Sequence, residues 1–522
     1  MKMSIPDWWV KNRWIERSVF LILVVANATP LFFNRYFPFM DAPAHLYNSG
    51  VLWHLLSGDG GFYKEYFAFN SVLVPNWISY LIMSPLHFFM NPAMAEKCFL
   101  LVYFIGFPFA MRYCISCIVP GRGYLAYLAF PLSYNMLTMF SFYNFSMALI
   151  FFLLCIGYFY KHIVWAKALL RHYLILSLLV FLTFLSHPVV LCITFLILLL
   201  IYVHEQYISH GALLLKWFNG KTLRIIIAVL PSIIFMILYL MAPTTGKPAY
   251  QFLSTSDLFQ RVLDGAIFIA YSQDEALAAK AVSISLCCTF FISLFLLIFS
   301  FSRYGIRSKT FFLFPSVLMM LLLYWFMPDS DGMGGFISMR LCIILFISCI
   351  LFIASFNFYK SFLAALLIFV LVCQAYRLNI YANSIKSRRP EVAAITEEAH
   401  FVEPESFLYT YEVDDDWLGG HYHNYLCLEQ KCIPLQDYEC QTTYFPLVWR
   451  NYGQMNDLIN NVRSFRNLEN IKKETRNHPL YYWILGDLSV KTEPAYVELR
   501  HNLAEHCTLV DHTDYCSLYK LN

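Results

Sequence analysis

Charged residues are scarce in this sequence, which excludes an ordinary water-soluble globular protein. Asp, Glu, Lys and Arg make up only 14% of 522 residues, whereas hydrophobic residues make up 59%. Soluble domains are about a quarter charged and about half apolar. The net charge is only +3 and no dense basic run occurs, so nucleic acid is not an expected partner. The composition predicts a polytopic α-helical membrane protein.

Several widespread nucleotide-binding and catalytic motifs are missing as well. The sequence contains no Walker phosphate loop, dinucleotide-binding glycine pattern, Ser-centred nucleophile elbow or His-Glu-x-x-His zinc motif. The glycine-rich turn Gly332–Gly335 lacks the Lys-Ser/Thr that follows a phosphate loop. ATP-driven transport by this chain alone is therefore not expected.

Long hydrophobic runs predict about eleven transmembrane helices. Each run is long enough to cross roughly 30 Å of hydrocarbon. Another apolar stretch, Val72–Phe89, is interrupted by prolines and polar residues, so we expect it to dip into the membrane or pack beside it. The runs lie near 18–34, 96–118, 123–140, 143–160, 170–186, 188–204, 223–242, 281–301, 310–327, 338–356 and 359–381.

The positive charges between these runs favour one topology. With eleven crossings and a cytoplasmic N-terminus, the main Lys and Arg clusters all face the cytoplasm, whereas counting Val72–Phe89 as a crossing moves most of them outside. We therefore expect a transmembrane domain over 1–382, with a first extracytoplasmic loop over 35–95. Residues 383–522 are expected to form an extracytoplasmic domain.

The polar C-terminal segment has the pattern of a small α/β domain. Its strands are predicted at Phe407–Val413, Tyr481–Leu485, Thr508–Asp511 and Ser517–Leu521, and its helices at Pro390–His400, Met455–Lys473 and Ala495–His506.

Five cysteines cluster in the same segment, as in a disulfide-bearing extracytoplasmic domain, although the sequence does not give their pairing. They are Cys427, Cys432, Cys440, Cys507 and Cys516. A zinc site that adds His421 and His423 is a less favoured alternative, because no Cys-x-x-Cys pair is present.

A carboxylate and an imidazole follow the first hydrophobic run closely. Asp41 and His45 are four residues apart, and Pro43 suits the first turn of a helix. Asp41 would then lie at or near the N-cap and share a helix face with His45 and Asn48. We expect this helix to lie along the membrane surface. The alternative is that Asp41 only caps the helix and His45 only reaches the interface.

Other polar residues gather at the predicted outer ends of the spans. Such groups are costly near hydrocarbon and are therefore candidates for substrate binding. Arg340 could instead form a salt bridge with a nearby aspartate, Arg261 could pair with Asp257 one helical turn away, and His187 could simply end a helix. The candidates are Tyr143, Asn144, His187, Arg261, Asp329, Asp331 and Arg340.

This arrangement resembles the GT-C superfamily of integral membrane glycosyltransferases. In that superfamily the first span leads into a long extracytoplasmic loop with an acidic residue near its start, many spans follow, and a soluble domain often closes the chain. Asp41, within Phe39-Met40-Asp41-Ala42-Pro43-Ala44-His45, matches the position of the catalytic acidic residue. Ala42 departs from the Asp-Glu pair of several members.

The resemblance implies transfer of a hexose or pentose from a polyprenyl-phosphate donor to a glycan, lipid or protein acceptor outside the cytoplasm. Asp41 would be the base and Arg340 the cation for the leaving phosphate, while His45 would orient Asp41 or bind substrate. No cofactor is expected, and the location implied is a bacterial inner or plasma membrane. The turn Ser141–Asn144 has no carboxylate, which favours a metal-independent, inverting monosaccharide transferase.

Two other functions share some of these features. A lipid-linked sugar flippase or secondary transporter is disfavoured because no internal repeat is evident and the polar residues gather at one predicted membrane face. A polysaccharide polymerase or ligase also uses lipid-linked donors, and it would depend on outer-loop residues such as His187 rather than on Asp41.

Overall fold

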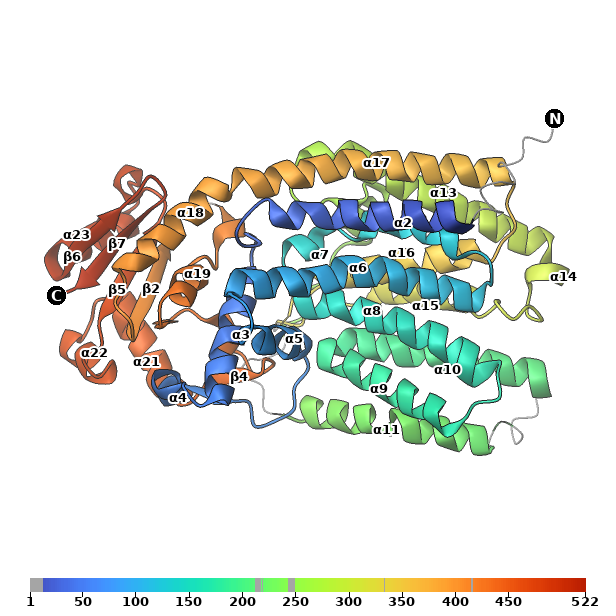
Figure 1. The fold of residues 1–522 in the computed structure, drawn as a ribbon, viewed down its shortest axis with the longest axis horizontal. Helices are drawn as coiled ribbons and strands as arrows, with labels where there is room; N and C mark the ends of the chain where they lie inside the picture. Colours follow the sequence, from blue (N-terminus) through green and yellow to red (C-terminus); the bar gives the residue numbers. More distant parts are fainter. Residues whose placement is uncertain (1–12, 212–216, 218, 243–248, 333, 415) are drawn as a thin grey trace. The chain divides into compact units, whose positions relative to one another are not determined.

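A computed structural model describes residues 13–211, 217, 219–242, 249–332, 334–414 and 416–522. Met333 of the glycine-rich turn and residues 243–248 of the predicted loop 243–280 lie outside these ranges. The chain divides into two compact units. The first contains Met1–Pro30, Leu101–Met139 and Asn144–Asn383, and the second contains Leu31–Leu100, Phe140–Tyr143 and Ser384–Asn522. Figure 1 labels their elements along the chain.

The described residues include eight helices that are long and apolar enough to cross a membrane, which confirms the polytopic helical class. Shorter apolar helices are η2 (Gly123–Leu132), α9 (Leu170–Ser186) and α15 (Leu313–Phe326). The eight are formed by α2 (Arg13–Ala28), α6 (Pro92–Ile118), α8 (Tyr143–Tyr158), α10 (Pro188–His210), α11 (Gly220–Leu240), α13 (Ala276–Phe299), α16 (Ile337–Ala354) and α17 (Lys360–Ser387).

The predicted span over 123–140 is not one α-helix. It contains the 3₁₀ segment η2 and the short α7 (Met136–Met139). At about 2 Å per residue, a ten-residue 3₁₀ segment covers about 20 Å, less than the hydrocarbon thickness of roughly 30 Å. Pro131 lies inside the segment, where it removes a backbone donor.

Several polar residues buried in the first unit are hydrogen-bonded within it. Helices α2 and α17 run together (Figure 1), and Gln374 donates a 2.8 Å hydrogen bond to the side-chain oxygen of Asn27. The fully buried Arg377 donates to the carbonyls of Pro131 at 3.1 Å and Tyr134 at 2.9 Å. These bonds offset the cost of burying a guanidinium, so Arg377 has a structural role.

Helix α3 (Ala42–Ser57) begins directly after Asp41, which confirms the predicted helix but not its location. Every residue from Ala42 to Leu52 is buried, so this part of α3 is covered by protein on all its faces and does not expose an apolar stripe. The reason is that α3 packs against both α5 (Ile78–Leu86) and α19 (His423–Glu429) within the second unit. The nine-residue α5 is the helix within Val72–Phe89 and is too short to cross a bilayer.

The C-terminal part of the second unit is the predicted α/β fold. Its five-stranded sheet has the order β3-β2-β5-β7-β6, with β2 parallel to β3 and β5, and with β7 antiparallel to β5 and β6. Helix α18 (Arg389–Glu398) packs on it, and the buried Trp483 donates a 2.7 Å hydrogen bond to Glu398. The strands are β2 (Ser406–Glu412), β3 (Cys432–Pro434), β5 (Leu480–Leu485), β6 (Cys507–His512) and β7 (Cys516–Leu521).

One helix of this segment differs from the sequence prediction, and one disulfide gives the pairing that the sequence left open. The single helix predicted over Met455–Lys473 is two helices, α21 (Tyr452–Arg463) and α22 (Leu468–Glu474), because Phe465 and Asn467 adopt positive φ angles between them. Among the described cysteines only Cys427 and Cys432 form a disulfide. The last helix, α23 (Pro494–His506), forms as predicted.

Candidate active site

The backbone before Asp41 is held by hydrogen bonds from distant parts of the second unit. The amide of Phe37 donates to the buried Glu96 carboxylate at 2.9 Å, and the Tyr425 hydroxyl donates to the Phe37 carbonyl at 2.7 Å. The Tyr422 hydroxyl donates to the Pro38 carbonyl at 2.8 Å. Side chains from α6 and from the α19 region therefore fix where Asp41 begins its helix.

Asp41 occupies the N-cap of α3 without capping it through its side chain. Its backbone is in the right-handed helical region and its carboxylate makes no cap hydrogen bond. Instead, Oδ1 of Asp41 lies 3.5 Å from Nε2 of His421, and the two side chains are 14% and 21% exposed. The carboxylate is therefore directed toward an imidazole and remains within reach of another molecule.

His421 is a neutral partner for this carboxylate. Burial, followed by the positive charge of His45, lowers the pKa of His421 to about 4. The ring of Tyr438 stacks on it with centroids 4.8 Å apart. A neutral imidazole can orient Asp41 through its ring nitrogen without neutralising the carboxylate.

The side chain of His45 forms an ion pair with Glu439, and its predicted role of orienting Asp41 or binding substrate stays a prediction. Its Nδ1 lies 2.6 Å from Oε1 of Glu439, and both side chains are almost fully buried. The Tyr80 hydroxyl donates to the other oxygen of Glu439. Burial opposes protonation of His45, but the Glu439 carboxylate outweighs it and raises the pKa of His45. This pair places a positive charge near Asp41 and His421.

A second buried carboxylate lies beside this pair. Asn48 donates to Oδ1 of Asp437 at 3.1 Å. Burial, and then the neighbouring Glu439, raise the pKa of Asp437 to about 7. Asn48 thus hydrogen-bonds to a buried acid within the fold, and its predicted contact with substrate stays a prediction.

The structure brings acids to Asp41 that the sequence did not single out. Tyr143, a predicted substrate-binding residue, donates to Oε1 of Glu96 at 2.9 Å, and its ring lies 5.2 Å from that of His45. Glu96 is the only acidic residue in the hydrophobic run 96–118, a signal that could have identified it. Asp437 and Glu439 carry no such signal, because they lie in an ordinary polar segment.

The other predicted residues belong to the first unit, where Asp329 shapes the start of α16. Its Oδ1 accepts bonds from the amide of Ser338 at 3.0 Å and from the Ser338 hydroxyl at 2.5 Å. Arg261, in α12 (Thr255–Leu263), donates to the same hydroxyl at 3.3 Å. Asp329 and Arg261 thus meet at one serine.

Arg340 and Asp331 flank a glycine in this region. A Cβ atom built on Gly334 would lie 3.8 Å from Oδ1 of Asp331 and 4.0 Å from Nη1 of Arg340. His187, in the turn between α9 and α10, is 8% exposed, and its pKa is lowered by burial and then by the charge of Arg340. Asn144 lies at the start of α8 and is buried, with 4% exposure.

Metal ligation was an alternative for the C-terminal cysteines and histidines. Across the described ranges, no group of three or more His, Cys, Asp or Glu side chains is placed to hold a metal ion. The predicted alternative of a zinc site with His421 and His423 also loses Cys427 and Cys432, which are bonded to each other.

Solved structures with a similar fold are found for this chain, whereas the comparisons of its sequence with family models and curated proteins find no match. No family model matches the chain, and no curated protein matches it. The structure of ArnT from Cupriavidus metallidurans bound to undecaprenyl phosphate is similar, with a TM-score of 0.55, 10% identity, and coverage of 96% of this chain and 97% of that one. The apo oligosaccharyltransferase of Archaeoglobus fulgidus has a TM-score of 0.48 and 11% identity, over 96% of this chain and 74% of that one. The similarity to ArnT spans both units, and the chain therefore has the fold of the GT-C membrane glycosyltransferases.

Proposed function

We propose that the protein transfers a sugar from a polyprenyl-phosphate donor to a hydroxyl group of an extracytoplasmic acceptor, with Asp41 as the general base. The observation that carries this proposal is the Asp41 carboxylate, partly exposed and 3.5 Å from a neutral His421, in a chain with the GT-C fold. The similar ArnT structure contains undecaprenyl phosphate, which supports a polyprenyl phosphate as the lipid.

The reaction requires little from the protein beyond a base and charge stabilisation. The acceptor oxygen attacks the anomeric carbon while its proton passes to Asp41, and the bond from that carbon to the phosphate oxygen breaks. The electron pair of the broken bond leaves with the lipid phosphate. Attack opposite the leaving group inverts the anomeric configuration. A positioned base typically contributes about 10²–10⁴-fold to such a step.

The fixed charges around Asp41 suit this role. Glu439 raises the pKa of His45, and the protonated form of His45 would favour the ionised Asp41 carboxylate needed for a base. His421 stays neutral and can hold one carboxylate oxygen while the other accepts the proton. The reaction as proposed uses no cofactor and no metal ion.

Arg340 is proposed to bind the donor phosphate. A guanidinium presents forked donors that match a phosphate, and Arg340 is the sole charged residue of α16. Arg340 belongs to the first unit. The proposal that it binds phosphate depends on the chemistry of its guanidinium and on its place at the start of a membrane helix. His187 and Asp331 would modulate the electrostatic potential around the Arg340 guanidinium.

The test is an assay with purified protein in lipid nanodiscs and a panel of polyprenyl-phosphate sugars. We expect release of polyprenyl phosphate that requires an acceptor, persists in EDTA, and is lost in Asp41→Asn. A flippase would instead move the donor between leaflets of sealed vesicles without releasing polyprenyl phosphate. That result, or full activity of Asp41→Asn, would contradict the proposal.

A further inference from the structure

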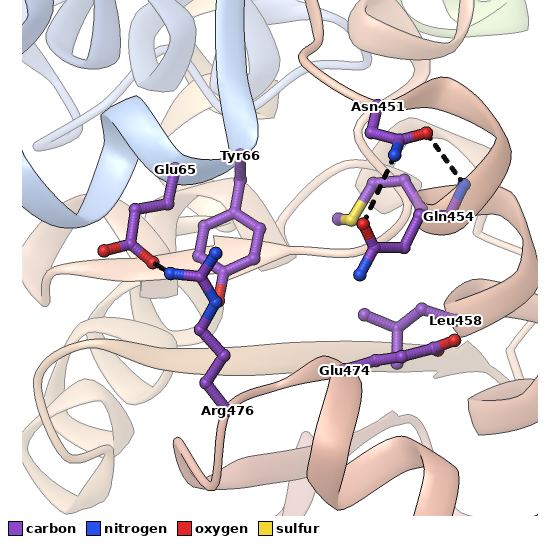
Figure 2. Close-up of a pocket in the computed structure, with 8 residues that line it drawn as sticks. Glu65, Tyr66, Asn451, Gln454, Leu458, Glu474 and Arg476 are labelled. Carbon is purple, nitrogen blue, oxygen red and sulfur yellow. Dashed lines mark hydrogen bonds and ion pairs between the residues drawn. The ribbon is translucent and has the colours of Figure 1, made fainter.

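A pocket in the second unit shares no lining residue with the surroundings of Asp41 described above and is lined by polar, apolar and aromatic side chains. Figure 2 shows Glu65, Tyr66 and Arg476 on one side of it and Asn451 and Gln454 on the other. Met455, Leu458 and Glu474 complete the lining. The pocket thus combines an aromatic ring, two apolar side chains and several hydrogen-bonding groups.

A short β-ribbon builds this pocket from two distant segments. Strand β1 (Phe67–Phe69) pairs antiparallel with β4 (Leu447–Trp449), so that Phe67 lies opposite Trp449. Tyr66, the last residue of α4 (Gly61–Tyr66), accepts a 2.7 Å bond from the amide of Arg450 through its carbonyl. Tyr66 and Asn451, which caps α21, therefore emerge at the same end of the ribbon.

Two buried polar atoms in this lining lack hydrogen-bond partners among the described residues. They are the hydroxyl of Tyr66, whose side chain is only 8% exposed, and Oε2 of Glu474. The other Glu474 oxygen accepts a 2.9 Å bond from Asn470. A buried polar group without a partner costs about 1–3 kcal/mol, which a bound hydroxyl could recover.

The pocket's charge and size define the class of ligand. Its two carboxylates outnumber its single guanidinium, which is already paired with Glu65, so the pocket disfavours anions. Its volume of about 40 Å³ is room for about three water-sized groups, at about 10–15 Å³ each. A ligand would insert one edge bearing two or three hydroxyl groups, within reach of the Tyr66 hydroxyl and the Glu474 carboxylate.

We infer that this pocket binds a neutral saccharide unit of the acceptor through its hydroxyl groups. That this saccharide belongs to the acceptor rests on the proposed function, but sugar binding itself does not require catalysis. Glu474 would accept from one hydroxyl, Tyr66 would bond another, and the exposed Gln454 amide would reach a third. Acceptor recognition would then occur at a place separate from Asp41.

The test measures sugar binding to the full-length protein in nanodiscs, without alkyl-glycoside detergents, whose head groups would compete. Saturation-transfer NMR with methyl glucoside, methyl galactoside, methyl mannoside and lactose should detect saturable binding of at least one, and inorganic phosphate added as a competitor should not displace it. Tyr66→Phe or Glu474→Gln should weaken binding at least tenfold. The controls Tyr452→Phe and Glu469→Gln lie on α21 and α22, which both contribute to the lining, but are not themselves lining residues, and they should leave binding unchanged.

Asp41→Asn separates this inference from the proposed function. This variant should bind sugar as wild type does. Its binding should be the same whether it loses transfer, as the proposed function requires, or keeps it because Asp41 is dispensable. Absence of saturable binding by all four sugars, displacement of the sugar by phosphate, or equal binding by wild type and both pocket variants would overturn the inference. Thermal unfolding should show Tyr66→Phe at least as stable as wild type, because it removes a buried hydroxyl without a partner.

Discussion

Nδ1 of His45 lies 2.6 Å from Oε1 of Glu439, and these two buried groups come from opposite ends of the chain. Glu439 follows the sheet strand β3 in sequence, whereas His45 lies in the first turn of α3. The pair therefore joins the N-terminal and C-terminal parts of the second unit. Its protonation links the stability of the unit to pH.

Glu439→Gln should destabilise the protein most at acidic to neutral pH. The pKa of His45 is raised above its ordinary 6.5, so the pair's contribution is fully present below pH 6.5 and is lost as pH rises through the folded-state pKa. Breaking a buried ion pair costs about 3–5 kcal/mol. Thermal unfolding from pH 5.5 to 9 should show the Tm difference from wild type shrinking with pH. The double variant His45→Gln, Glu439→Gln should show little of this pH dependence, and a constant difference would disprove the linkage.

Asp41→Asn should lower transfer by at least about 10²-fold with little change in Tm. The Asp41 side chain makes no capping bond to α3, so the amide should not weaken the helix. The measurement is polyprenyl phosphate release by purified protein. Asp59→Asn is a suitable control, because Asp59 is 60% exposed and lies just beyond the same helix. A fall in protein yield instead of rate would indicate a structural role for Asp41.

His421→Asn should reduce kcat/KM while leaving the shape of its pH profile unchanged. The pKa of His421 is about 4, so its imidazole is neutral from pH 5.5 to 9 in the native protein. A group that does not titrate in that range cannot produce a limb of the profile there. We expect parallel profiles, with the variant lower by about tenfold. Loss of one limb would show that His421 itself exchanges the proton.

Arg340→Lys should weaken donor binding more than it changes stability, because Lys keeps the charge but loses the forked geometry. Donor affinity can be measured by titration, with the exposed Arg303→Lys as control. If Arg340 instead pairs only with Asp331, donor binding should survive Arg340→Gln. In that case the double variant Asp331→Asn, Arg340→Gln should recover stability lost by Arg340→Gln alone.

The C-terminus should lie outside the cytoplasm, as the distribution of positive charge predicts. A reporter that functions only outside the cytoplasm should be active when fused after Asn522. The matching fusion of a cytoplasm-only reporter should be inactive. The reverse pattern would mean that the C-terminal segment, together with loop 35–95, which packs against it in the second unit, lies in the cytoplasm.

The sequence determined much of the secondary structure by itself. Membrane helices depend on long apolar runs, so the predicted runs match observed helices except at η2, where Pro131 and the 3₁₀ geometry intervene. The strands β5, β6 and β7 follow from local sequence patterns, and each of their predicted bounds differs from the observed bound by at most one residue. Asp41 was found because its place after the first run matched a family pattern.

Only the tertiary structure decided what surrounds Asp41. Local sequence could not show that α3 is buried against α5 and α19, because burial depends on which distant segments pack together. For the same reason it could not identify Glu439 as the partner of His45, or His421 as the partner of Asp41. A charge next to hydrocarbon is visible in the sequence, but its partner is chosen by packing, which brings together residues that no local pattern relates.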